Sequence, residues 1–287
     1  MMKKILVALS LMAFAVVGGR AALADRSPDI NPNTHLHPTR DQAKPGGGGG
    51  TSNLSYHNGP VIHSARVVSI FWGPTWATGG SDNGISSHIV AFFNQFGGNG
   101  HYATITQYSD TTGAIQSTSL GNTAWYDATM PPTNVTDAAV QAEVTRYLTS
   151  GGGTFDTSTI YEVFLPASSY SSNGSSDSCG GPNLAYCAYH GHYSSGSLTN
   201  VKYASMPYPS CGGCQASGFS TQENFDHFAS HETREAVTDP DGNAWYDRRG
   251  NEADDKCAWT PAPFIDSGYG YQYEWSNKSG GCVATGQ

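Results

Sequence analysis

The pattern of apolar and polar positions along the chain predicts strands and helices in turn. Four runs rich in β-branched and aromatic residues predict strands at Pro60–Gly73, Gly113–Leu120, Thr159–Pro166 and Val201–Tyr208. Two segments carry apolar residues at helical spacing, which predicts helices around Ile85–Phe96 and over Thr136–Gly153, the second with Thr136 as its N-cap. The stretch between the last two strands, rich in serine and glycine, is expected to be a loop.

A third helix is expected from Ser220 to Asp239. Ser220 with Glu223 three residues later forms a capping box, and Pro240 disfavours helical backbone at Asp239. An acidic loop follows, and then a strand pair around Tyr269–Asn277. This order of elements predicts one α+β (mixed α/β) domain with a mixed sheet, an active-site helix and loops held by disulfides.

The third helix carries a row of polar residues beside its apolar stripe. His227, His231, Glu235 and Asp239 follow one another at intervals of four, so each lies one turn above the last. Residues 231–235, H-E-T-R-E, differ from the zinc-hydrolase motif H-E-x-x-H only in the last ligand. The row predicts His231 and Glu235 as metal ligands and Glu232 as the general base that takes a proton from a metal-bound water.

The third ligand stays open at this point. Asp239 is the first choice, His227 the second, and His190 or His192 in C-A-Y-H-G-H-Y the third. Because a carboxylate ligand makes the site harder, the expected cofactor is a divalent metal, with zinc favoured and calcium possible. A looser calcium site within residues 241–255, where five carboxylates gather, is a separate hypothesis.

The beginning of the chain has the pattern of an exported protein. Residues 1–24 combine two lysines, a short apolar run and an Ala-Leu-Ala site, which predicts a signal peptide and secretion to an extracellular or periplasmic location. Residues 25–55, rich in proline and glycine, are expected to be a disordered linker in which His35 and His37 are solvated. The remaining residues 56–287 are expected to form the single domain.

Charge and cysteines limit the possible partners. Loss of residues 1–24 removes three of the 14 basic residues and none of the 23 acidic ones, so the net charge changes from −9 to 11 − 23 = −12. An acidic exported chain is a poor candidate for binding nucleic acid or an anionic membrane. The six cysteines predict three disulfides, and local pairing gives 179–187, 211–214 and 257–282 as the working assignment.

Four segments together resemble the phosphate-induced protein 1 family, also called EXORDIUM-like. They are H-N-G-P-V-I-H-S-A-R-V-V-S-I-F-W-G-P-T-W (residues 57–76), C-A-Y-H-G-H-Y (187–193), V-K-Y-A-S-M-P-Y-P-S-C-G-G-C-Q (201–215) and S-H-E-T-R-E-A-V-T-D-P (230–240). The last segment is similar to the bacterial branch, and the resemblance implies a secreted protein but supplies no catalytic function. The order of elements is also similar to that of zincin metallopeptidases, which is an analogy of fold and motif.

Two functions are expected from these observations. The first is a secreted, metal-dependent hydrolase, foremost a zincin-like metallopeptidase acting as a monomer on an extracellular peptide or cell-wall polymer. The alternative is a non-catalytic cell-wall or glycan-binding protein with structural calcium. A zincin-like protein that has lost its chemistry is a third hypothesis, motivated by Glu235 at the position of the second histidine.

Overall fold

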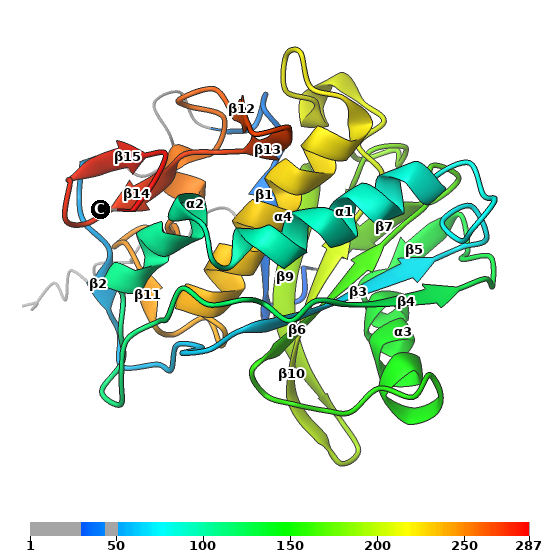
Figure 1. Ribbon diagram of the computed structural model, residues 1–287, viewed down its shortest axis with the longest axis horizontal. Coiled ribbons are helices and arrows are strands. Elements are labelled where there is room, and N and C mark those ends of the chain that lie inside the picture. The colour runs from blue at the N-terminus through cyan, green and yellow to red at the C-terminus, as the bar shows by residue number, and fades with distance from the viewer. Residues whose placement is uncertain (1–29, 44–50, 287) are drawn as a thin grey trace, which may run out of the picture.

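The computed structural model describes residues 30–43 and 51–286. A six-stranded mixed sheet forms the centre, with the strand order β1-β9-β10-β6-β3-β4 (Figure 1). The four strands from β10 to β4 are mutually parallel, and β9 runs antiparallel to β10 and to β1. The strands are β1 (Thr34–Pro38), β3 (Arg66–Trp72), β4 (Thr123–Asp127), β6 (Thr159–Phe164), β9 (Tyr186–Ser195) and β10 (Leu198–Met206).

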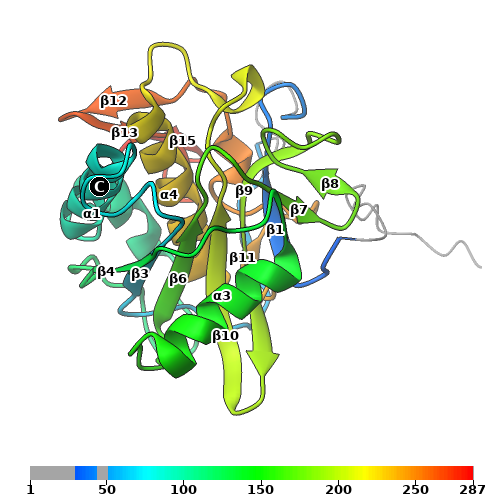
Figure 2. The same cartoon turned by 90° about the vertical axis from the view of Figure 1, so that its right-hand side faces the viewer.

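Helices cover both faces of this sheet. Helices α1 (Asn83–Phe96) and α4 (Thr221–Thr238) lie on one face, and α3 (Asp137–Ser150) lies on the other (Figure 2). Each face has its own apolar core, because side chains alternate between the two sides of every strand. The predicted mixed α/β class with a mixed sheet and helices is therefore confirmed.

Helix α3 forms for the reasons visible in its sequence. Thr136 has extended backbone, and its hydroxyl accepts a hydrogen bond from the backbone N–H of Ala139. Val140 and Val144 are buried against the sheet, while the opposite side of the helix meets solvent. The helix ends where Gly151 follows Ser150, so the predicted helix over residues 136–153 is confirmed within its normal boundary error.

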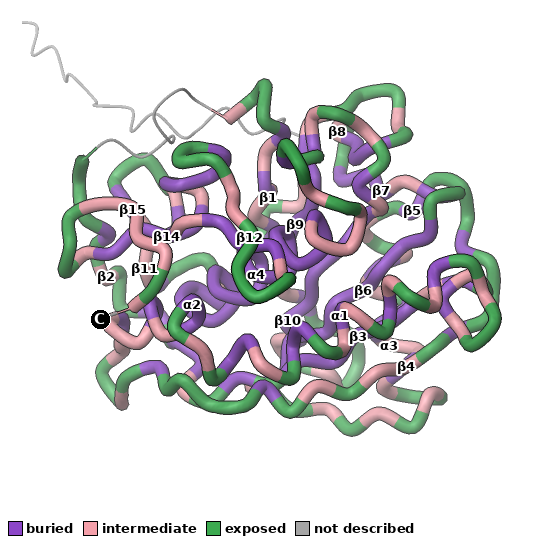
Figure 3. The backbone as a smooth tube through the Cα atoms, turned by 45° about the horizontal axis from the view of Figure 1, so that its top comes forward, coloured by how far each residue is buried: buried purple, intermediate pink, exposed green. Residues whose placement is uncertain are grey.

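Helix α4 is buried on all sides. Its capping box is present, with the Ser220 hydroxyl accepting from Glu223 N–H and the Glu223 carboxylate accepting from Ser220 N–H. Residues 224–238 are all buried, including the polar ones (Figure 3). The sheet covers one side of α4, α1 lies along another, and the C-terminal region with β13 (Tyr269–Tyr271) covers the rest.

The remaining elements are short. A 3₁₀ turn, η2 (Gly212–Cys214), precedes α4, and η3 (Asp255–Cys257) lies in the acidic loop after it. The others are β2 (Ser55–Tyr56), α2 (Gly100–Ala103), η1 (Thr104–Gln107), β5 (Asn134–Thr136), β7 (Tyr170–Asn173), β8 (Ser176–Asp177), β11 (Trp245–Tyr246), β12 (Phe264–Asp266), β14 (Glu274–Ser276) and β15 (Gly281–Val283).

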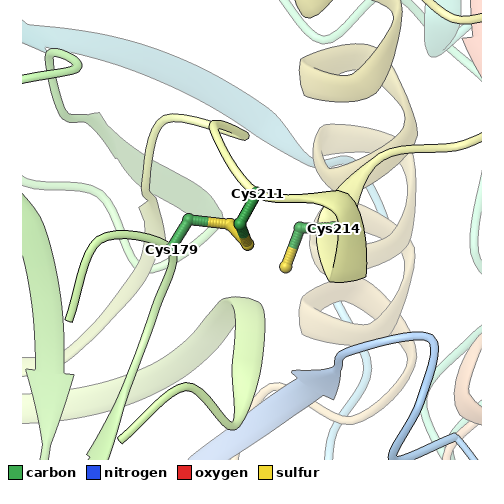
Figure 4. Close-up of side chains that lie close together, drawn as sticks. All are labelled: Cys179, Cys211 and Cys214. Atoms are coloured by element: carbon green, nitrogen blue, oxygen red, sulfur yellow. A yellow bond between two sulfur atoms is a disulfide. The ribbon is translucent and has the colours of Figure 1, made fainter. Parts of the chain in front are cut away.

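All six cysteines are paired in disulfides, but two of the three predicted pairings were wrong. Cys179 pairs with Cys211, and Cys187 pairs with Cys214. Cys211 and Cys214 lie at opposite ends of a tight turn, with Cys211 joined to Cys179 and the Cys214 sulfur beside that bond (Figure 4). The bonds therefore tie β7–β9 to the turn before α4. Only the pairing of Cys257 with Cys282 is confirmed.

Three other expectations need correction. Residues 113–120 contain no strand beyond a single bridge at Ala114, and the neighbour of β3 is β4 instead. The expected loop before residue 201 contains the ten-residue strand β9. The expected disordered linker is wrong for residues 34–38, because they form β1 on the edge of the sheet, where five register pairs with β9 order them. The predicted signal peptide lies outside the described residues.

Within residues 30–43 and 51–286, no helix combines the length and apolar character needed to cross a membrane. The three disulfides are typical of proteins that mature in an oxidising compartment.

Candidate metal centre

Helix α4 brings three functional side chains to one buried place. His231 and Glu235 lie one helical turn apart, and His231 Nε2 is 3.0 Å from Glu235 Oε2. Glu232 points toward the same region, because the three residues form a group whose ligand atoms all lie within 4.8 Å of one another. The predicted trio of His231, Glu232 and Glu235 is thus brought together by the helix.

Strand β9 contributes His190 to this region. Its Nδ1 lies 3.0 Å from Glu232 Oε2 and 3.9 Å from Glu235 Oε2. Its Nε2 lies 3.7 Å from Glu252 Oε2, which comes from the acidic loop after α4. His190, Glu235 and Glu252 form a second group within 4.8 Å, so Glu235 is common to both groups.

A glutamine sets the tautomer of His231. Gln272 Nε2 donates to the carbonyl and to Oδ1 of Asp254, so its other atom, Oε1, is an acceptor. His231 Nδ1 lies 3.2 Å from that oxygen and therefore carries the proton. His231 Nε2 is left with a lone pair directed at the cluster, the arrangement seen when a second residue orients a metal-binding histidine.

The same reasoning applies to His190. When Glu232 is ionised, as a bound cation would keep it, its contact with Nδ1 places the proton on Nδ1 and leaves the lone pair on Nε2 near Glu252. His231 Nε2 and Glu235 Oε2 are then two acceptor atoms only 3.0 Å apart. Two acceptors at this distance repel each other unless a proton or a cation lies between them.

The distances fit a metal ion. Ligands arranged as a tetrahedron at 2.0–2.1 Å from zinc lie roughly 3.3 Å from one another. The contacts of 3.0 Å and 3.7 Å bracket this value. Among the described residues, His231 Nε2 and Glu232 Oε1 are buried with no hydrogen-bond partner, and the two buried Glu252 oxygens lie near His35 and His190. The donor set of two imidazoles and two carboxylates suits a divalent cation such as zinc.

Burial also shifts the protonation of the cluster. Burial, reinforced by the charge of Glu235, raises the pKa of Glu232 well above its ordinary value. Burial raises the pKa of Glu235 to about 8 and that of Asp255 to about 8. Burial lowers the pKa of His231. The carboxyl groups therefore hold protons up to neutral pH in the metal-free protein, and a bound cation would displace them.

The nearby cations are engaged elsewhere. Arg234 pairs with Asp254 and, at 3.4 Å, with Glu274. Asp241 pairs with Lys202, and Asp247 lies 3.3 Å from Lys256. Three of the five carboxylates in residues 241–255 thus have cationic partners, so the geometry does not support the hypothesis of a calcium site within that loop.

Two predicted ligands have other hydrogen-bond partners. Asp239 Oδ1 accepts a hydrogen bond from Ala244 N–H, because the residue before Pro240 leaves the helical backbone and turns its side chain toward the following loop. His227 Nε2 lies 3.0 Å from Gln272 Oε1 and its ring packs against Trp259. Neither residue belongs to the two groups of converging ligand atoms, although Asp239 Oδ2 is buried without a hydrogen-bond partner among the described residues, so both assignments stay predictions. His192, two residues beyond His190, lies farther along β9.

Sequence reasoning missed four residues that border the cluster. Glu252 is completely buried, and Asp255 Oδ1 lies 3.8 Å from His231 Nε2. His35 Nδ1 lies 2.8 Å from Glu252 Oε1, and the rings of His37 and His231 have centroids 4.1 Å apart. The only sequence signal for Glu252 and Asp255 was the high density of acidic residues in N-E-A-D-D (residues 251–255). Nothing in the sequence distinguished the two histidines from residues of a solvated tail.

A polar cavity of about 250 Å³ opens beside the cluster. One wall comes from Asn33 and His35 before and within β1, and another from Asp239 to Gly242 after α4. His190 and His192 lie between them. His190 is thus the cluster residue that borders this cavity.

The fold and the cluster together define a disulfide-bonded mixed α/β protein with a buried His/Glu/Asp centre. Comparison of the chain with known protein families, with curated proteins and with solved structures gives no match.

Proposed function

We propose that this protein is a metal-dependent hydrolase of the metallopeptidase kind, with an extracellular peptide as its foremost substrate. One observation carries the proposal: two buried groups of ligand-type side chains, His231 with Glu232 and Glu235, and His190 with Glu235 and Glu252, share Glu235. A divalent metal bound there would supply a nucleophile from water at neutral pH and would polarise a carbonyl group.

Four residues would hold the metal: His231 and Glu235 from α4, His190 from β9, and Glu252 from the loop. Each element is fixed independently, because β9 is paired on both sides, α4 is buried on all sides, and the loop is anchored through Asp254 to Arg234. Such a preorganised ligand set favours metal binding, since little is lost in ordering the ligands.

Glu232 has two chemically reasonable roles. As a general base it would take a proton from the attacking water, with its pKa raised by burial. As a positioning residue it would accept a hydrogen bond from His190 Nδ1 and hold the ring with Nε2 toward the metal. The first role requires the carboxylate charge, whereas the second needs only an acceptor oxygen.

The test combines metal analysis with two variants at Glu232. We expect about one equivalent of zinc per purified chain and cleavage of an unstructured protein substrate such as casein. Glu232→Gln keeps an acceptor for His190, so a base role predicts retained metal with kcat lowered by about 10²–10⁴-fold. Glu232→Ala removes the acceptor, so a positioning role predicts metal affinity lowered by about 10–100-fold. A metal-free protein, or full activity in Glu232→Gln and Glu232→Ala, would contradict the proposal.

A second candidate function is a non-catalytic extracellular protein with a structural cation. It is favoured by the burial of the cluster, because His231 and Glu232 are 0% exposed and Glu235 is 1% exposed. All six tryptophans are buried or half-buried, so they form no exposed platform for a glycan. This alternative predicts that chelation lowers the melting temperature while no peptide or polysaccharide is cleaved.

A further inference from the structure

Two segments separate the cluster from solvent. On one side β1 places His35 against Glu252 and His37 against His231. On the other side lies the C-terminal region around Gln272. Because His190 is 2% exposed and the α4 ligands less, a peptide reaches the cluster only if one of these segments moves.

The C-terminal region is firmly held. The Cys257–Cys282 disulfide joins the acidic loop to the last strand. Asp254 in that loop is bonded to the buried Arg234 and accepts from Gln272, and Trp275 N–H donates to the Ala253 carbonyl. This region also supplies Glu252 itself, so its departure would dismantle the centre.

The segment with β1 is held without covalent bonds. No cysteine precedes Cys179, so no disulfide can attach it. It pairs with β9 alone, at the end of the sheet order. Its polar anchors are hydrogen bonds and one ion pair: Asn31 bonds to Asp137 and Asn173, Arg40 donates to two backbone carbonyls before α4, the Pro38 carbonyl accepts from Trp259, the Thr34 hydroxyl accepts from Asn173, and His35 lies beside Glu252. Of the two covers, β1 is therefore the one that can leave while the rest stays folded.

The side chains of β1 divide between the two faces of the sheet. His35 and His37 face α4, and Leu36 between them packs into the apolar core on the α3 side. His37 is 0% exposed, and neither of its ring nitrogens has a hydrogen-bond partner among the described residues. Burying an unpaired imidazole weakens the fold, so stability alone does not explain this histidine.

We propose that residues 30–43 are an internal inhibitor, in which β1 occupies the edge of β9 and its two histidines close the metal centre. This inference rests on the proposed function. Displacement of β1 exposes the backbone N–H and C=O groups of residues 186–191, and an extended peptide can pair with them in the same antiparallel register. The peptide would then pass beside His190 on the α4 side of the sheet.

The test releases the segment by a designed cut. A seven-residue recognition sequence for a site-specific protease replaces residues 44–50, which are one lysine, one proline and five glycines. After cleavage and removal of the segment, we expect the circular dichroism spectrum to be unchanged. A fluorescent synthetic peptide of residues 30–43 should bind with 1:1 stoichiometry. A chelator should extract the metal at least about tenfold faster than from the uncut protein. Unfolding on release, or extraction at the uncut rate, would show that β1 is a permanent strand and would overturn the inference.

A pair of point variants tests the same idea in the uncut chain. Leu36→Asp weakens the docking of β1 from the face opposite the cluster, so metal extraction should accelerate without any change to a ligand. Leu198→Asp in β10 is the matched control, since Leu198 is also half-buried in the α3-side core but lies outside β1. Equal effects of the two variants would indicate general loosening and contradict the inference.

Peptide binding also separates this inference from the proposed function. A peptide with His35→Ala and His37→Ala should bind the cleaved protein more weakly than the natural sequence. This readout needs no turnover and no metal. If the cleaved protein binds the peptide but hydrolyses nothing, the inhibitor inference stands and the hydrolase proposal is rejected. If the cleaved protein is active but never binds the peptide, the hydrolase proposal stands and the inhibitor inference is rejected.

Discussion

Helices α3 and α4 begin in the same way and have opposite surroundings. Each starts with a hydroxyl residue that caps the first turn, Thr136 in α3 and Ser220 in α4. Helix α3 buries one stripe against the sheet and leaves its other side in solvent, whereas α4 has residues 224–238 buried all round. The two helices therefore share their N-terminal capping, and they differ in burial because other parts of the chain cover α4 on the sides that α3 leaves in solvent.

The comparison shows what a fully buried polar helix requires. The buried polar groups of α4 need partners from elsewhere, and the C-terminal region supplies several of them: Gln272 for His227 and His231, and Asp254 for Arg234. Other partners come from β6, where Glu162 accepts from Thr233, and from α1, where His88 lies 2.7 Å from Asp226. The buried atoms without a hydrogen-bond partner among the described residues include His231 Nε2 and Glu232 Oε1, and also both carboxylate oxygens of Glu274. Those of His231 and Glu232 coincide with the predicted chemistry, which is the reason to regard the cluster as a ligand site.

The largest expected effect is a loss of activity on substitution of a buried glutamate, and it should occur in α4 but not in α3. Glu235→Gln should lower kcat/KM on the order of 10⁴-fold, about 5.5 kcal/mol, because a metal ligand is lost. Glu143→Gln on α3 is the matched control: Glu143 is 3% exposed with its pKa raised by burial to about 7, but it pairs with Arg146 and borders no ligand group. Steady-state kinetics and metal analysis measure both, and a similar loss in both variants would refute a special role for Glu235.

The next effect concerns the arginine of each helix. Arg234→Met leaves Asp254 and Glu274 as buried charges without their cation, which should lower the free energy of unfolding by about 4 kcal/mol. Arg146→Met on α3 should cost less, because solvent screens a guanidinium that is 39% exposed, although its partners Glu143 and Asp127 are buried. Urea denaturation at pH 7 measures both. Equal losses would contradict the assignment of Arg234 to a buried network.

Metal removal should reveal a pH dependence that belongs to α4. The folded pKa of Glu235 and of Asp255 is about 8, above the unfolded values near 4, so their stabilising protonated form is lost as the pH rises toward and past 8. The metal-free protein should therefore lose roughly 3 kcal/mol of stability between pH 7 and 9, about half from each group. With metal bound, these groups are already ionised at pH 7 and the decrease should vanish. Denaturant titrations with and without chelator check this, and parallel pH profiles would contradict it.

The smallest expected effect is the one the two helices share. Thr136→Ala and Ser220→Ala should each lower stability by about 1 kcal/mol, because each removes the acceptor for one N–H group of the first turn. Thermal unfolding of the two variants gives the comparison. A much larger loss for Ser220→Ala would mean that burial, and not only the cap, acts at the start of α4.

Much of the fold was predictable from local patterns. The apolar stripe and cap of α3, the capping box of α4 and the aromatic run of β6 carry their own signals. Strand β9 was missed because its sequence, Y-C-A-Y-H-G-H-Y-S-S, is poor in β-branched residues and is made a strand by pairing with β1 and β10. The edge strand β1 was missed because pairing and burial, which lie outside a local window, order it.

The site was predictable where it lies on one helix and unpredictable where it depends on tertiary contacts. Helical spacing alone brings His231 and Glu235 together, and the adjacent Glu232 joins them. The choice of His190 and Glu252 over Asp239 depends on the path of β9 and of the acidic loop. Asp239 continues the row in sequence, but its backbone leaves the helix before the proline, so the spacing no longer holds there.

The interleaved cysteines have a consequence for biosynthesis. Cys179 and Cys187 are synthesised before Cys211 and Cys214, yet each pairs with one of the later two, and the bonds cross in sequence order. During vectorial synthesis the first two thiols are made before either native partner, so a bond formed between them would have to be exchanged for the final ones. We therefore expect the yield of active protein to depend on a disulfide isomerase in the producing cell. The strand that carries His190 would reach its final covalent form only after the chain has been made at least as far as Cys214.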